Sequence, residues 1–276
     1  MDGCAGDDKK QKMSPELYFA LTLIVKMTIT AGFVLAATIT AERAGPLVGA
    51  LVATLPLGAG PVYVFLALDH DSHFIAQSTV NSLAINTINA IFALTYALLA
   101  QKRPLSVSLP VAMLVWAVLA WTVHEIHWNL PSVILLNVVV LGVSIPLARP
   151  LRHVRMPPFR AHWTDLAMRA ALVALLVGIT VTFSFRLGSG GSGILAVFPV
   201  ILLSIMFILH NRVGGKPTAA VLSNAPLGLV GFAFACTVLH FTAEPFGNAI
   251  GLALALATSI GWSLLVLLAR RRGVDV

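Results

Sequence analysis

Two basic side chains lie inside long apolar runs of this chain. Lys26 and Arg169 each stand about one-third of the way into such a run. A charge at that depth in a bilayer is costly and usually faces a bundle interior or an aqueous cavity. Two cations without matching acidic residues in their spans predict a site for an anion or an anionic headgroup. The alternatives are that both reach the interface on their long stems, or that Arg169 pairs with Asp165.

Prolines and amides add polar backbone and side-chain groups to the same runs. Pro56 and Pro199 fall near the middle of two apolar segments, where each removes a backbone hydrogen bond. This indicates either a simple kink or a broken helix that lines a substrate path. The residues Leu55–Pro61 are a candidate break, because Gly58, Gly60 and Pro61 follow Pro56.

A polar stripe marks the segment after residue 75. Ser78, Ser82, Asn86 and Asn89 have the spacing of one helical face, and Asn81 widens it. Such a stripe either forms hydrogen bonds between helices or lines a pathway. A later segment echoes it in part, with Ser223 and Asn224.

Other clusters have weaker chemical signals. The runs Asp69–His73 and His124–His127 hold His beside Asp or Glu, but neither has the spacing of a known zinc motif. Gly188–Gly193 has no following Lys and is interpreted as a flexible outer loop, not a phosphate site. We therefore expect no cofactor and no bound metal.

Composition decides which solvent surrounds these residues. The 276-residue chain is 58% apolar and 11% charged, with a mean hydropathy of +0.91. A soluble domain has about 25% charged residues. The apolar runs are unbroken, as in Leu252–Leu268, and are long enough for helices that cross a bilayer. The sequence predicts an all-α polytopic membrane protein.

About nine transmembrane helices are expected, and the positive-inside rule orients them. Their predicted ranges are 16–40, 47–68, 75–100, 105–124, 130–149, 164–185, 193–210, 217–241 and 246–269. Arg149, Arg152, Arg155 and Arg160 place one connection in the cytoplasm. The N-terminus then lies outside and the C-terminus inside a cell inner membrane. The net charge of +7 is thus a topology signal, and no nucleic-acid partner is expected.

The chain also matches itself at an offset of 143 residues. This offset aligns Lys26 with Arg169, Pro56 with Pro199, and Asn81 with Asn224. One period contains five predicted spans, an odd number, so the second copy enters the membrane from the opposite face. The expected organisation is a first four-helix repeat (1–128), a linker helix (129–150) and a second, inverted four-helix repeat (151–276).

This plan resembles fused forms of dual-topology four-helix proteins, such as fluoride channels and small multidrug resistance exporters. The resemblance covers the arrangement only, since the motifs of neither group are present. A further likeness, around Phe198-Pro199 and the apolar run to His210, is to uncharacterised GlpM-type membrane proteins.

Inverted repeats are common in secondary transporters, whose sites lie near the midplane between the repeats. We therefore expect a transporter or flippase of a small or lipid-linked solute that works by alternating access, and we expect this solute to be anionic. The expected solute-binding residues are the repeat-paired Lys26, Arg169, Asn81, Asn224, Pro56 and Pro199, together with Asn86. An ion channel of the same symmetry, an integral membrane enzyme acting on lipid, and an assembly subunit are the alternatives. Membrane lipid is the expected partner of a monomer or homodimer.

Overall fold

The protein is described by a computed structural model that covers residues 14–43, 58–154 and 162–272. These residues form helices and short connections, with no strand among them. In chain order the helices are α1 (Pro15–Arg43), α3 (Ala59–Asp69), α4 (Ser72–Leu99), α5 (Leu105–His124), α6 (Leu130–Ala148), the 3-10 helix η1 (Arg149–His153), α7 (Trp163–Ala196), α8 (Val200–Val213), α9 (Gly215–Leu222), α10 (Ala225–Phe246) and α11 (Asn248–Arg271).

Long apolar helices confirm the predicted class, an all-α polytopic membrane protein. In the described part of the chain, seven helical segments are long and apolar enough to cross a bilayer, and α3 is a shorter apolar helix. Their outer surfaces carry large apolar side chains, such as Leu114, Leu135 and Leu265, which are exposed on the bundle. This is the surface expected of helices that face hydrocarbon.

The expected number of nine membrane helices is not confirmed. The predicted spans 164–185 and 193–210 belong to one continuous apolar segment, Trp163–Val213, which contains α7 and α8. The predicted span 47–68 is described only from residue 58 onward, as the short helix α3.

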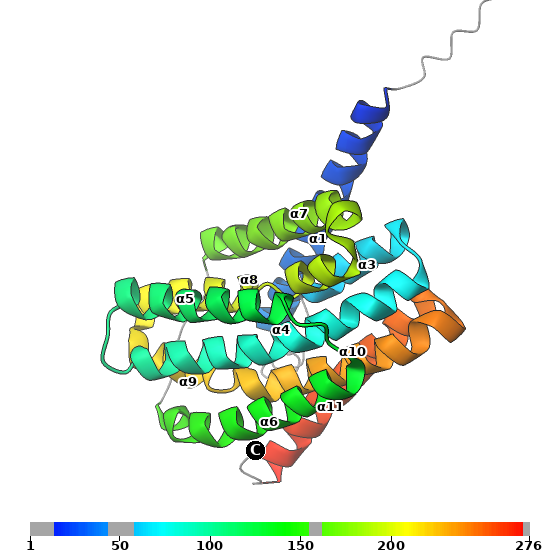
Figure 1. Ribbon diagram of the computed structural model, residues 1–276. Coiled ribbons are helices and arrows are strands. Elements are labelled where there is room, and N and C mark those ends of the chain that lie inside the picture. The colour runs from blue at the N-terminus through cyan, green and yellow to red at the C-terminus, as the bar shows by residue number, and fades with distance from the viewer. Residues whose placement is uncertain (1–13, 44–57, 155–161, 273–276) are drawn as a thin grey trace, which may run out of the picture.

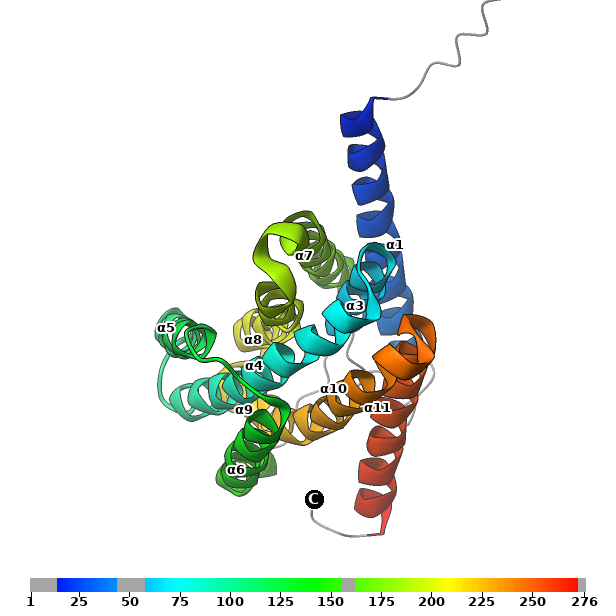
Figure 2. The ribbon, with the colours of Figure 1, turned by 45° about the vertical axis from the view of Figure 1, so that its right-hand side comes forward.

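Helix α4 lies at the centre of the bundle (Figure 1) and is the most deeply buried of the seven candidate spans. It packs against α5, α6, α7, α9 and α10. Its start is stabilised by Asp71, whose side chain accepts a hydrogen bond from the Phe74 backbone N–H. Figure 2 shows α1 at the edge of the bundle, with its first turns extending past the other helices.

The apolar segment that contains α7 and α8 is interrupted twice. Gly188 has φ 64° and ψ −172°, a conformation that is essentially restricted to glycine. The chain turns back there, so that α8 lies against α7 (Figure 1). The expectation of a flexible loop at Gly188–Gly193 is wrong, because residues 189–196 are helical. A second break, at residues 197–199, separates α7 from α8 and includes Pro199.

The short stretch between these two breaks packs closely against α4. A Cβ atom on Gly193 would overlap the carbonyl oxygen of Ser78, whereas one on Gly190 would lie 3.6 Å from the Asn81 side-chain nitrogen, an ordinary contact. Gly193 therefore allows the two backbones to approach each other.

We predict that Gly193→Ala lowers the free energy of unfolding by about 1–3 kcal/mol, because the added methyl group forces the two helices apart. The matched variant Gly190→Ala should leave it nearly unchanged. Thermal unfolding of the purified protein in detergent, followed by tryptophan fluorescence, measures both. Equal midpoints for the two variants would contradict the close packing at Gly193.

Candidate functional site

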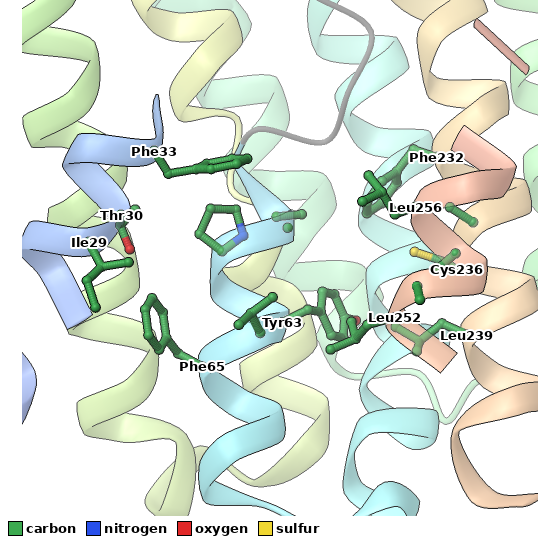
Figure 3. Close-up of a pocket in the computed structure, with 17 residues that line it drawn as sticks. Ile29, Thr30, Phe33, Tyr63, Phe65, Phe232, Cys236, Leu239, Leu252 and Leu256 are labelled. Atoms are coloured by element: carbon green, nitrogen blue, oxygen red, sulfur yellow. The ribbon is translucent and has the colours of Figure 1, made fainter. Parts of the chain in front are cut away.

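A cavity of about 380 Å³ lies among α1, α3, α10 and α11 (Figure 3). Helices α1 and α3 belong to the N-terminal half of the chain (residues 1–128), and α10 and α11 to the C-terminal half (residues 151–276). Phe65 reaches from α3 toward α1, and Tyr63 reaches toward α10 and α11. The volume is within the range of small-molecule sites, about 300–1,000 Å³.

Among the described residues, three side chains with polar atoms line this cavity: Thr30, Tyr63 and Cys236. The Thr30 hydroxyl donates to the carbonyl oxygen of Lys26, at 2.8 Å, within its own helix. The Tyr63 hydroxyl lies 2.7 Å from Ser82 Oγ on α4. Ser82 Oγ in turn donates to the carbonyl oxygen of Gly193, at 2.8 Å, so Tyr63 is the donor to Ser82. A chain of hydrogen bonds thus connects the cavity to the interrupted segment of α7.

The polar stripe on α4 makes hydrogen bonds to neighbouring helices. Ser78, Ser82, Asn86 and Asn89 are all buried. Asn86 Nδ2 donates to Asn137 Oδ1 on α6 and to the Leu229 carbonyl on α10, at 2.9 and 3.0 Å. Of the two roles that the sequence left open, these contacts favour hydrogen bonding between helices.

Asn89 holds the break between α7 and α8. Its Nδ2 donates to the Val197 carbonyl at 2.8 Å, and its Oδ1 accepts from Trp116 Nε1 at 2.8 Å. Trp116 is on α5 and lies 5.0 Å from the Phe198 ring in an edge-to-face contact. The carbonyl freed by the break is therefore satisfied inside the protein.

Lys26 has an acidic partner, contrary to expectation. Its Nζ lies 2.7 and 2.6 Å from the two carboxylate oxygens of Asp69, at the end of α3. The Lys26 side chain is 10% exposed and that of Asp69 is 24% exposed. The sequence of the Lys26 span does not reveal this pair, because Asp69 is 43 residues away and belongs to another helix. Lys26 Nζ also lies 5.8 Å from the centre of the Phe65 ring, which borders the cavity.

Asp165 binds Arg212 on α8, at 2.9 Å, and Arg169 is half-buried on α7. Asn224, at the start of α10, accepts from Arg270 on α11 at 2.6 Å. Asn81 is half-buried and lies near Gly190. Pro56 lies outside the described residues.

The cavity was not predicted from the sequence. None of the described candidates lines it; these are Lys26, Asn81, Asn86, Arg169, Pro199 and Asn224. One available signal was Tyr63, one of three tyrosines in the chain, in the middle of an apolar run. Comparisons of the chain with known protein families, with curated proteins and with solved structures give no match.

Histidines connect the helices near the expected outer face. His70 Nε2 lies 2.7 Å from Ser184 Oγ on α7, and His73 Nδ1 lies 2.8 Å from Glu244 Oε1 on α10. His70 also stacks on Phe74, with ring centres 3.8 Å apart. The described residues contain no group of three or more His, Cys, Asp or Glu side chains placed to hold a metal ion.

We predict that Lys26→Met destabilises the protein by up to about 3 kcal/mol, because it leaves the largely buried Asp69 carboxylate without its cation. The double variant Lys26→Met/Asp69→Leu should recover most of this loss, since no buried charge then remains. Unfolding midpoints in detergent for the single and double variants provide the measurement. A double variant less stable than the single one would show that the pair itself stabilises the fold.

Partial burial lowers the pKa of His70, although Asp69 and Asp71 oppose this effect. His70 therefore binds fewer protons in the folded state than in the unfolded state. The stability that neutral His70 contributes is present above pH 6.5, the ordinary pKa of histidine, and should be lost as the pH falls below that value. We expect the natural protein to lose more thermal stability between pH 7.5 and 5.5 than His70→Gln, in which this group is absent. An identical loss in both would rule out a contribution from His70.

Proposed function

We propose that this protein is a membrane transporter or flippase that moves a small or lipid-linked solute by alternating access between two inverted halves. The observation that carries the proposal is the cavity, because helices of both halves line it. Solute sites in secondary transporters lie between their repeats. A discontinuous helix, which is also common in such transporters, is connected to this cavity through Tyr63 and Ser82.

The helix boundaries support an internal repeat at the 143-residue offset. Helix α4 starts at Ser72 and α9 at Gly215, while α5 starts at Leu105 and α11 at Asn248. Both pairs of starts differ by 143 residues. The offset also relates α1 to α7 and α3 to α8. Helix α6 then remains as the linker between the two copies.

Helix packing is consistent with a two-fold relation between the copies. Helices related by the offset pack on each other, as α1 does on α7 and α4 on α10. The contact between α3 and α11 has its counterpart in the contact between α8 and α5. These exchanged contacts are expected of two copies facing each other across an axis in the membrane plane.

The two ion pairs support the same relation. Lys26–Asp69 joins α1 to α3, and Asp165–Arg212 joins α7 to α8. Asp69 and Arg212 occupy positions 143 residues apart, but their charges are opposite. In an inverted repeat these two positions lie on opposite sides of the membrane. The positive-inside rule favours a basic residue on the cytoplasmic side only, which agrees with Arg212 on that side and Asp69 on the other.

Nine crossings follow if Trp163–Val213 crosses the membrane twice and α3 is part of a complete span. The orientation is then N-terminus outside and C-terminus in the cytoplasm of a bacterial-type inner membrane. Arg152, in η1, lies close to Arg149 and Arg270, so basic residues gather at one end of the bundle. This clustering supports a cytoplasmic location for that end.

Alternating access requires the halves to move against each other, and a cross-link between them tests this. His73 is on α4 and Glu244 on α10, with side-chain atoms 2.8 Å apart. We predict that joining His73→Cys and Glu244→Cys with the reducible cross-linker ethane-1,2-diyl bismethanethiosulfonate, in a protein lacking Cys4 and Cys236, stops solute flux into proteoliposomes, and that a reductant restores it. Flux is measured with a panel of uncharged, anionic and lipid-linked fluorescent solutes.

The matched control is the same cross-link within one half. Asp165→Cys/Arg212→Cys joins α7 to α8, and the native side-chain atoms of this pair are 2.9 Å apart. This variant should retain flux before and after reduction. Flux that persists through the inter-half cross-link would favour a channel with static halves, and absence of flux for every solute in the natural protein would overturn the proposed function.

A further inference from the structure

The chemistry of the cavity wall restricts what can occupy it. We infer that the cavity binds an uncharged, largely apolar small molecule, and not the anion suggested by the basic residues in the spans. This inference rests on the proposed function for its role in transport, whereas the binding itself is independent of that role.

The described part of the wall offers no ionic partner to a solute. None of the described lining residues is charged, and most are aliphatic or aromatic, including Phe33, Phe65, Phe232 and Leu239. A charge transferred into such surroundings loses its hydration without compensation, which is strongly unfavourable. An apolar solute loses nothing comparable and gains contacts with the wall.

The nearest described ion pair does not change this preference. Lys26 is bound through both carboxylate oxygens of Asp69, so the pair has no net charge. An anion that took the place of Asp69 would leave that carboxylate without its cation. The Phe65 ring lies beside Lys26 and forms part of the cavity wall.

The polar atoms in the wall are also largely engaged. The Thr30 hydroxyl donates its hydrogen bond to the Lys26 carbonyl within α1, and the Tyr63 hydroxyl donates to Ser82 Oγ. The Tyr63 and Thr30 oxygens retain acceptor capacity, because each hydroxyl acts as the donor in its bond. The site therefore accommodates one or two weakly polar donor groups on an otherwise apolar molecule.

Cys236 lies in the wall and is buried, so its alkylation requires a small reagent to enter the cavity and is blocked when the cavity is occupied. The chain has two cysteines, so Cys4→Ser leaves Cys236 as the single thiol. Its rate of alkylation by N-ethylmaleimide is measured by intact mass, with the protein in nanodiscs of dioleoylphosphatidylcholine. The two probes are N-phenyl-1-naphthylamine, which is uncharged, and 8-anilinonaphthalene-1-sulfonate, which has the same ring skeleton with one sulfonate.

We expect N-phenyl-1-naphthylamine to slow alkylation of Cys236 about tenfold near saturation. The sulfonated probe, compared at an equal amount partitioned into the nanodisc, should have little effect because its charge must be buried. Equal protection by both probes, or stronger protection by the sulfonate, would overturn the inference. Protection by the uncharged probe only after delipidation in detergent would assign the cavity to a lipid chain and would also overturn it.

A substitution that fills the cavity provides a second test of the inference. Ala253 lines the cavity from the exposed side of α11, so Ala253→Phe should occupy the space without disturbing the buried core. Ala257 is one turn further along α11, equally exposed, and outside the lining, which makes Ala257→Phe the control. We expect Ala253→Phe to weaken binding of the uncharged probe about tenfold and Ala257→Phe to leave it unchanged. Equal binding to both variants would show that the probe occupies another site.

Binding and transport can fail separately. Protection of Cys236 by the uncharged probe, with no flux of any solute, would support the inferred ligand class and overturn the transporter. Flux of anionic solutes that Ala253→Phe leaves intact, together with no protection by the uncharged probe, would overturn the ligand class and retain the transporter.

Discussion

The absence of water in the hydrocarbon core is the constraint on which this structure depends. A helix that breaks there must find partners for its freed backbone groups within the protein. The segment from α7 to α8 breaks at Gly188 and again at residues 197–199. Ser82 and Asn89 on α4 bind the carbonyl oxygens of Gly193 and Val197, so one polar helix face supports the interrupted segment. This explains why α4, the helix with the most regular polar stripe, lies at the centre of the bundle.

The same constraint links the cavity to the interior of the protein. Tyr63 places its ring in the cavity wall and its hydroxyl on Ser82, which holds Gly193. Displacement of the Tyr63 ring would therefore act on the support of the interrupted segment. The connection consists of two hydrogen bonds.

Two charged side chains on α1 and α7 are neutralised by ion pairs with neighbouring helices. Lys26 with Asp69, and Asp165 with Arg212, each connect two helices and join residues 43 and 47 positions apart in the sequence. Because an isolated charge is unfavourable in hydrocarbon, such pairs allow basic residues to lie within spans without a bound ion. The Lys26–Asp69 pair is therefore better evidence for helix packing than for an anion site.

The sequence by itself determined that the helices lie in a membrane. It has too few charged residues to cover a surface that faces water, and its apolar runs are long enough to cross a bilayer. It also determined the polar face of α4, since a spacing of three and four residues places side chains on one side of any helix. Tertiary structure alone decided the partners of Lys26 and Asp165 and the location of the cavity. These partners and the cavity depend on residues far apart in the chain; Tyr63 and Cys236, for example, both line the cavity. The spacing of residues within a single helix carries no information about which helices become neighbours.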